Sequence, residues 1–212
     1  MVLPRFYPIL DTDVVLRRGI DPMDAARQML AAGARILQFR HKGFLSREAF
    51  AWLEQIAEVT RAAGATLVVN DRADLTKLFG AALHLGQDDL LPTIARRVVG
   101  PDAIVGYSTH NEAQLRAACT EPADYFALGP IFGTATKENP DPTVGLDELR
   151  RLRPLSNRPL VAIGGITRTN AIQVIEAGAD SVAVIGSGFD YLNGVRTGDA
   201  ADRDQRTVRE RA

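Results

Sequence analysis

Pro159-Leu160-Val161-Ala162-Ile163-Gly164-Gly165-Ile166-Thr167 is the stretch that decides the fold of this chain. Its apolar first half predicts a buried strand, and the glycines lead into a helical pattern at about 170–177 that ends at Gly178. A second apolar run, Ser181-Val182-Ala183-Val184-Ile185, then predicts another strand. Strands this continuously apolar are buried on both faces, which is typical of a parallel sheet. The stretch therefore predicts a strand–helix–strand unit.

The same unit recurs along the chain about every 20–30 residues, as expected of a βα repeat. Seven helical patterns separate eight predicted strands, at residues 6–10, 35–40, 66–69, 82–85, 103–107, 123–128, 159–163 and 181–185. Eight units predict a single closed (β/α)8 barrel of the α/β class. An open doubly wound sheet is the alternative, and it is less favoured because no dinucleotide fingerprint follows the first strand.

The end of the chain departs from this repeat. Residues 195–212 contain five arginines and four acidic residues among small polar ones, without an amphipathic stripe. We therefore expect residues 1–188 to form the barrel and residues 189–212 to form a polar, flexible tail. This tail stands in place of a clear eighth helix.

Composition limits the possible functions. The 212 residues are 46% hydrophobic and carry a net charge of −1, so no general basic field indicates a nucleic-acid partner. A single cysteine, Cys119, excludes an intramolecular disulfide and fits a reducing cytoplasm. No apolar run approaches the ~18 residues of a membrane span, and the first residues lack a signal-peptide core. We expect a cytoplasmic protein without a membrane partner. The sequence leaves open whether it forms a homo-oligomer.

Polar residues follow the predicted strands, and in such a barrel these positions meet on one face. After the second strand comes Gln38-Phe39-Arg40-His41-Lys42, whose alternation places Gln38, Arg40 and Lys42 on one side. Cations directed into a barrel are costly unless an anion neutralises them. The segment therefore indicates an anion site, with a strand end already in solvent as the alternative.

Carboxylates follow the next two strands, in Asn70-Asp71-Arg72 and in Gln87-Asp88-Asp89. Magnesium takes one or two carboxylates and completes its shell with water and phosphate, so these segments indicate a Mg²⁺ site. The alternatives are a helix N-cap for Asp71 and a solvated turn for the other pair. We interpret His84 as an ordinary core or rim residue.

The later loops contain hydroxyls, one lysine and glycines. Ser108 or Thr109 could cap a helix or donate to a ligand. The stretch Gly129 to Lys137 presents Thr134, Thr136 and Lys137 after a buried strand. Glycines at Gly164-Gly165 and at 186–188 resemble the phosphate site that such barrels form after strands 7 and 8, although Gly164-Gly165 could also be only a tight turn. Two anion pockets and a metal suggest displacement of pyrophosphate by a second phosphorylated substrate.

These motifs resemble the thiamine phosphate synthase family. The matching segments cover roughly residues 35–186: 38–42, 69–72, 83–89, 106–110, 125–137 and 162–167. The resemblance implies a transferase on a (β/α)8 barrel. It would join 4-amino-5-hydroxymethyl-2-methylpyrimidine pyrophosphate to a thiazole phosphate with Mg²⁺, by dissociative loss of pyrophosphate, giving thiamine phosphate.

The resemblance also implies residue roles. Asp71 and Asp89 would bind the metal. The pyrimidine pyrophosphate would contact Gln38, Arg40, Lys42, Asn70, Ser108 and Lys137, among which Arg40, Lys42, Ser108 and Lys137 are the candidate catalytic residues. The thiazole phosphate would contact Thr134, Thr136, Gly165, Ile185 and Gly186.

Two alternatives use the same barrel. A TenI-like thiazole tautomerase tends to carry His at the position of Pro130 and to lack the pair Asn70-Asp71, so these residues favour the synthase. A catalytically silent, phosphate-binding regulatory barrel would be expected to have lost the metal carboxylates. Gly186 departs from the family's frequent serine, and the tail departs from its closing helix.

Overall fold

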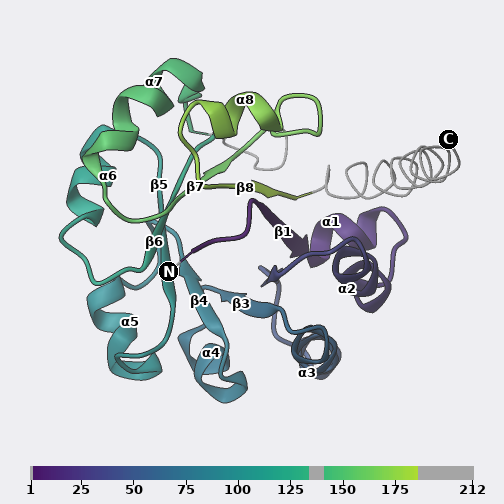
Figure 1. The fold of residues 1–212 in the computed structure, drawn as a ribbon. Helices are drawn as coiled ribbons and strands as arrows, with labels where there is room; N and C mark the ends of the chain where they lie inside the picture. The colour runs from purple at the N-terminus through teal and green to yellow at the C-terminus, as the bar shows by residue number, and fades with distance from the viewer. Residues whose placement is uncertain (1, 134–140, 186–212) are drawn as a thin grey trace, which may run out of the picture.

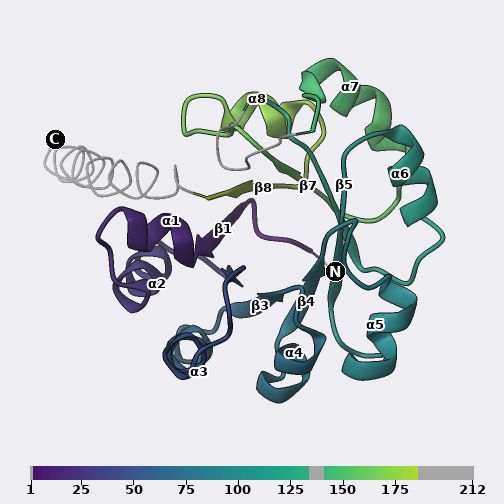
Figure 2. The ribbon, with the colours of Figure 1, turned by 180° about the vertical axis from the view of Figure 1, so that it is seen from behind.

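A closed barrel of eight parallel strands forms the centre of the molecule, with the helices around its outside (Figure 1). The structure is a computed structural model that describes residues 2–133 and 141–185. Each strand pairs with the next one along the chain, and β8 pairs with β1 to close the barrel. The reverse view shows the same ring of helices around the strands (Figure 2). The (β/α)8 prediction is confirmed.

Strands and helices alternate throughout the described residues. They are β1 Phe6–Asp11, α1 Thr12–Arg17, α2 Pro22–Ala31, β2 Ile36–Arg40, α3 Arg47–Ala62, β3 Thr66–Asn70, α4 Ala73–Phe79, β4 Ala82–Leu85, α5 Pro92–Val99, β5 Val105–Thr109, α6 Glu112–Ala118, β6 Tyr125–Leu128, α7 Gly145–Leu152, a 3₁₀ turn Arg153–Leu155, β7 Leu160–Ile163, α8 Ala171–Glu176 and β8 Ser181–Val184. The tail expected at 189–212 lies outside the described residues.

Short polar residues begin several of these helices. The Asp21 carboxylate accepts hydrogen bonds from the backbone N–H groups of Met23 and Asp24, with Pro22 at the first helical position of α2. Ser46 accepts from the backbone N–H of Ala49 at the start of α3. Such caps satisfy amide groups that have no partner inside the helix, which is why the sequence predicts these two starts well.

Two local features differ from the sequence prediction. The helix α1, which directly follows the first strand, was not predicted: Asp11 ends β1 and also caps α1, with its Oδ1 accepting a hydrogen bond from the Val14 N–H. A six-residue helix is too short to show a hydrophobic period, so a carboxylate that caps it resembles a strand breaker. The fifth strand was placed at 103–107 but runs to Thr109, and Asn111 rather than Ser108 or Thr109 caps α6.

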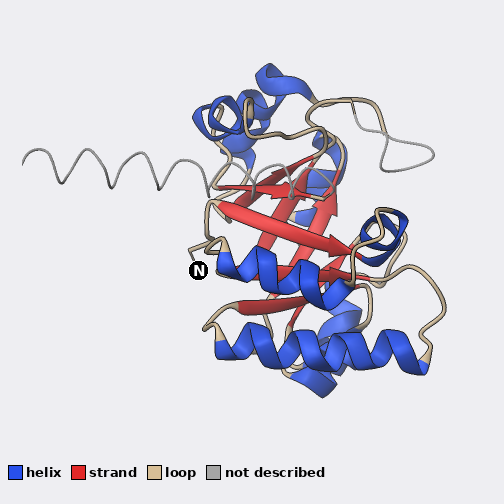
Figure 3. Cartoon of the chain, turned by 90° about the vertical axis from the view of Figure 1, so that its right-hand side faces the viewer, coloured by secondary structure: helices blue, strands red, loops and turns tan. Residues whose placement is uncertain are grey.

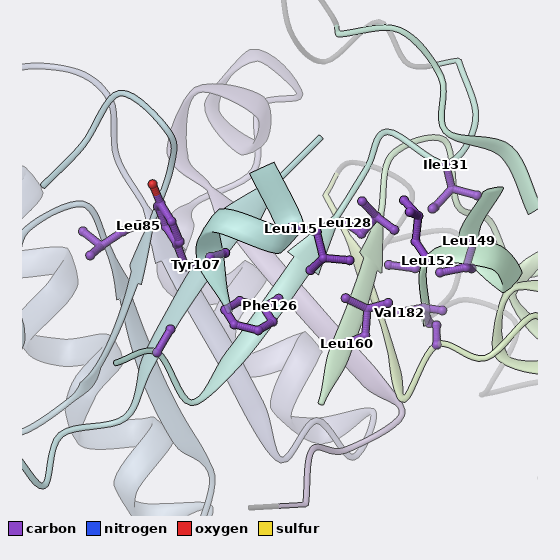
Figure 4. Close-up of a cluster of buried hydrophobic side chains, with 14 of the residues drawn as sticks. Leu85, Tyr107, Leu115, Phe126, Leu128, Ile131, Leu149, Leu152, Leu160 and Val182 are labelled. Atoms are coloured by element: carbon purple, nitrogen blue, oxygen red, sulfur yellow. The ribbon is translucent and has the colours of Figure 1, made fainter. Parts of the chain in front are cut away.

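The core has two layers. Between the strands and the helices lie the outward-facing side chains of the strands, including Leu128, Leu160 and Val182, packed against helix residues such as Leu149 and Leu152 (Figure 4). Inside the barrel lies a separate cluster, made of Leu3, Tyr7, Ile9, Ile36, Val68, Ala82, Tyr125, Ala127, Val161 and Ala183. Inward side chains that fill a barrel in this way make it a packed core and not a pore.

The inner cluster is apolar only toward the amino ends of the strands. Toward the carboxyl ends, buried polar residues take over at inward positions, among them Gln38, Asn70 and His84. Asn70 is paired with His84 in the register of β3 and β4. All strands point the same way, so their carboxyl ends meet at one end of the barrel (Figure 3). The polar residues therefore gather at that end.

Candidate active site

Two carboxyl groups approach each other at the carboxyl ends of β3 and β4. Asp71 follows β3, and Asp89 lies in the turn after β4, where its Oδ2 accepts from the Gly86 N–H at 2.7 Å. Burial and a hydrogen bond with Asp89 raise the pKa of Asp71 to about 6. Burial opposes ionisation of Asp89 as well, but hydrogen bonds from Asp71 and Gly86 keep its pKa below the usual value. Without a cation, the pair of carboxyls therefore takes up one proton as the pH falls through about 6.

The backbone of Asp71 also has an uncommon conformation. Its φ is 64°, in the left-handed region that few residues other than glycine adopt. Its N–H donates to the carbonyl oxygen of His84 at 2.8 Å, which ties this residue to β4. Strained backbone of this kind clusters at functional sites. Asp71 does not cap α4, whose N-cap is Arg72.

Lys42 forms an ion pair with Asp71 across the loops after β2 and β3. A cavity of about 180 Å³ opens at this point and is lined by residues of both loops, including Lys42, Asn70 and Asp71. The ammonium lowers the pKa of Asp71, but burial and Asp89 outweigh it. One lysine therefore does not neutralise the two carboxyls. The negative charge that remains when both are ionised would favour a divalent cation beside them.

A pair of carboxyls is also the right number for Mg²⁺ with a phosphate ligand, because that ion keeps several water and phosphate oxygens. Within residues 2–133 and 141–185, no three His, Cys, Asp or Glu side chains gather into a metal site. The donor set thus fits magnesium better than zinc, which takes four ligands from nitrogen or sulfur donors.

Asn70 provides a second sign of a missing ligand. Its side chain is only 8% exposed, and its Nδ2 has no hydrogen-bond partner in the part of the chain that the structure describes. A buried N–H group without a partner costs roughly 1–3 kcal/mol. A ligand oxygen next to Asp71 would satisfy it.

Arg40 and Asp11 form an ion pair at the ends of β2 and β1. Asp11 is buried, so its charge is fixed in place. One of its oxygens accepts from the Val14 N–H and the other from the Arg40 guanidinium. Sequence reasoning missed Asp11, although a carboxylate directly after a strand was the signal that it used at Asp71.

The other inward polar residues form a buried group. Gln38 donates to the Tyr7 hydroxyl, and Ser108 lies 2.9 Å from Nε2 of His84. Tyr125 lies between them, and its hydroxyl is hydrogen-bonded to the Tyr7 hydroxyl and to Nδ1 of His84. Burial lowers the pKa of His84 to about 4, so its ring is neutral near pH 7. His84 is thus the satisfied buried residue that the sequence predicted, and the two tyrosines were missed.

The loop after β6 packs on the turn after β7. The backbone N–H groups of Ile131 and Phe132 donate to the carbonyls of Ile163 and Gly164. Gly164 and Gly165 have φ values of 96° and 62°, and a Cβ at Gly165 would overlap Phe132 and Gly133. The tight-turn reading of these glycines is therefore confirmed, and a contact with ligand at Gly165 remains a prediction.

Some predicted site residues cannot be compared with the structure. Thr134, Thr136, Lys137 and Gly186 lie outside the described residues. Ile185 is described, half-buried at the end of β8 and packed against the inner cluster. The structure thus brings together the predicted residues of the loops after strands 2 to 5. No helix in the described ranges is long and apolar enough to cross a membrane.

Comparisons with known proteins identify the family of this chain. A family model described as thiamine monophosphate synthase matches residues 6–187. The thiamine-phosphate synthase of Koribacter versatilis is 51% identical over 191 residues, which are 86% of this chain and 88% of the relative. The thiamine-phosphate synthase of Chlorobium phaeovibrioides is 44% identical over 173 residues, 81% and 83% of the two chains.

A solved structure gives the same result. The thiamine phosphate pyrophosphorylase from Pyrococcus furiosus superposes with a TM-score of 0.75 at 27% identity, covering 90% of this chain and 96% of the other. The family match spans most of the chain, and the curated relatives match over most of their own length. The chain therefore belongs to the thiamine monophosphate synthase family.

Proposed function

We propose that this chain joins 4-amino-5-hydroxymethyl-2-methylpyrimidine pyrophosphate to thiazole phosphate by Mg²⁺-assisted loss of pyrophosphate. The transferase activity is that of its family. The observation that carries the metal and the leaving group is the contact between the Asp71 and Asp89 carboxyls beside Lys42. Two acidic groups and a cation, at the ends of the neighbouring strands β2, β3 and β4, match a metal-bound pyrophosphate.

In this proposal Asp71 and Asp89 hold the Mg²⁺, which would stabilise negative charge on the departing pyrophosphate. Arg40 and Lys42 add positive charge on the same side, and Lys137 belongs to this group in the family pattern. The N–H of Asn70 that lacks a partner would donate to a substrate oxygen or ring nitrogen. These groups act by charge and position, so no general base is required.

The bond that breaks joins the pyrimidine methylene carbon to pyrophosphate oxygen. The amino-substituted ring stabilises the carbon cation, and the thiazole nitrogen then forms the new bond with its lone pair. The thiazole phosphate would lie near Thr134, Thr136, Gly165, Ile185 and Gly186. The turn at Gly164 and Gly165 is packed against residues 131–133, the segment that leads directly to Thr134 in the sequence, which supports grouping these two loops in one pocket.

The two alternatives are less well supported. A silent regulatory barrel was expected to have lost the metal carboxylates, and both Asp71 and Asp89 lie together. A tautomerase does not use a pyrophosphate, and it gives no reason for Lys42 beside this pair.

The test is direct. Purified protein supplied with both substrates and Mg²⁺ is expected to release pyrophosphate and thiamine phosphate in equal amounts. EDTA is expected to stop the reaction, and added Mg²⁺ to restore it. A folded sample that forms no product at high enzyme concentration would exclude the proposal.

A further inference from the structure

Five polar side chains form a continuous hydrogen-bonded chain through the interior of the barrel. Gln38 Nε2 lies 2.9 Å from the Tyr7 hydroxyl, which lies 2.9 Å from the Tyr125 hydroxyl. The Tyr125 hydroxyl is 3.1 Å from His84 Nδ1, and His84 Nε2 is 2.9 Å from Ser108 Oγ. The chain thus joins β2 to β5 by way of β1, β6 and β4. Both of its ends, Gln38 and Ser108, are candidate contacts of the pyrimidine.

The direction of every hydrogen bond in this series follows from the first donor, the Gln38 amide. An amide nitrogen can only donate, so the Tyr7 oxygen accepts from Gln38 and its own hydrogen goes to Tyr125. The Tyr125 hydrogen then goes to Nδ1 of His84, which must carry a lone pair. A neutral ring with a lone pair on Nδ1 carries its hydrogen on Nε2 and donates it to Ser108.

The packing around the chain keeps these groups in place. The Tyr125 and His84 rings stack at 5.6 Å, and Tyr7 meets Tyr125 edge-on at 6.2 Å. A Cβ at Gly106 would overlap the Tyr125 ring, so glycine at this position of β5 leaves room for the tyrosine. Both tyrosines are fully buried.

Apolar residues of similar shape would fill this space without hydroxyls to satisfy. Among the described residues, this series of hydrogen bonds ends at the Ser108 hydroxyl, at the carboxyl ends of β4 and β5. Its oxygen is occupied by the hydrogen from His84, which leaves its own hydrogen for a ligand.

We propose that Tyr7, Tyr125 and His84 are positioning residues that make Ser108 a hydrogen-bond donor to the aminopyrimidine substrate. The inference rests on the proposed function for the identity of the ligand. An aminopyrimidine presents ring nitrogens with lone pairs beside its amino group, so a serine with a fixed free hydrogen selects a ring nitrogen. If the chain ran the other way, Ser108 would donate to His84 and could only accept from the ligand.

The first test needs no substrate. The side-chain ¹⁵N chemical shifts of histidine show which ring nitrogen carries the hydrogen. The protein has three histidines to assign. His84→Gln identifies the His84 signals by their loss. We expect the hydrogen on Nε2 of His84 in the wild-type protein at neutral pH. A hydrogen on Nδ1, on both nitrogens, or divided between them would overturn the proposal.

The second test breaks the chain at a residue that does not touch the substrate. Tyr125→Phe is expected to raise KM for the pyrimidine pyrophosphate about tenfold, the effect of one hydrogen bond, while KM for the thiazole phosphate stays unchanged. The His84 ring is expected to become a mixture of both tautomers. Tyr7→Phe is expected to act in the same direction and replaces Tyr125→Phe if that variant does not fold.

Thr109→Val is the matched control. Thr109 neighbours Ser108 on β5, and its buried hydroxyl donates to the Ala127 carbonyl, outside the chain of five. Loss of this hydroxyl is expected to reduce stability. It is expected to leave the His84 tautomer unchanged, and also the ratio of KM for the pyrimidine pyrophosphate to KM for the thiazole phosphate. Unchanged KM and tautomer in both tyrosine variants would overturn the proposal. If the wild-type protein is inactive but His84 has the predicted tautomer, the proposed function is contradicted. The direction of the hydrogen bonds from Gln38 to Ser108 is then still established.

Discussion

The Asp71 carboxyl, at the end of β3, is hydrogen-bonded to the Asp89 carboxyl, in the turn after β4. Asp88, the neighbour of Asp89, is exposed to solvent. Two acids that are separated in sequence thus lie in contact because parallel strands end at the same face. The first two predictions below follow from this pair.

Asp71→Asn is expected to lower kcat/KM about 100-fold or more, because the variant keeps the shape of the side chain but loses a charged metal ligand. Pyrophosphate release at saturating Mg²⁺ measures it. Asp74→Asn is the matched control, since Asp74 is an exposed carboxylate three residues later, paired with Arg72. Equal rates in the Asp71 variant and the wild type would show that the metal assignment is wrong.

The same pair makes stability depend on pH when no metal is present. Burial and Asp89 raise the pKa of Asp71 from 3.8 to about 6, so the folded protein binds a proton that the unfolded chain releases. This contribution is complete below about pH 4 and is lost as the pH rises through 6. In EDTA, the free energy of unfolding measured with urea is expected to decrease as the pH rises from about 4 to above 6. Asp71→Asn is expected to make this decrease smaller. An identical pH profile in the variant would contradict the raised pKa of Asp71.

Asp11→Asn is expected to lower kcat/KM about tenfold by releasing Arg40, while an amide oxygen can still cap α1. The change should appear mainly in KM for the pyrophosphate substrate. Asp21→Asn is its control, because Asp21 caps α2 in the same manner but has no arginine partner in the described residues. If both variants retain wild-type KM, Asp11 does not position Arg40.

The opposite end of the barrel is expected to affect stability alone. There the Asp124 carboxylate accepts from the Val105 N–H at 2.7 Å and from Arg96 at 2.8 Å, beside an open hollow of about 780 Å³. Asp124→Ala leaves both donors without this partner. It is expected to reduce the free energy of unfolding by about 1–3 kcal/mol, measured in urea, with KM unchanged.

Asp102→Ala provides the comparison for that variant. Asp102 lies at the same end of the barrel, shortly before β5, but is exposed. Its loss is expected to change the free energy of unfolding by less than about 0.5 kcal/mol. An altered KM in the Asp124 variant would show that this end of the barrel is coupled to the site.

Several features were predictable because their causes are local in sequence. Continuous apolar strands, capped helices and glycine stops follow from neighbouring residues, so the barrel and most element positions could be predicted. The candidate residues after strands 2 to 5 could be predicted as well, since chemistry at strand ends is visible as polar residues after apolar runs. The short helix α1 could not, because Asp11 has the same appearance whether it ends a strand or caps a helix.

Only the tertiary structure decided which of these residues act on one another. Asp71 contacts Asp89, Arg40 pairs with Asp11, and Tyr7 meets Tyr125 across the barrel, although the two tyrosines are 118 positions apart in the sequence. No sequence period records such contacts, because they depend on the closure of β8 onto β1 and on the register of the strands. The sequence by itself determined the repeat and the chemistry available at its strand ends. The closed barrel decided the distances between those groups, and hence their charges and hydrogen-bond partners.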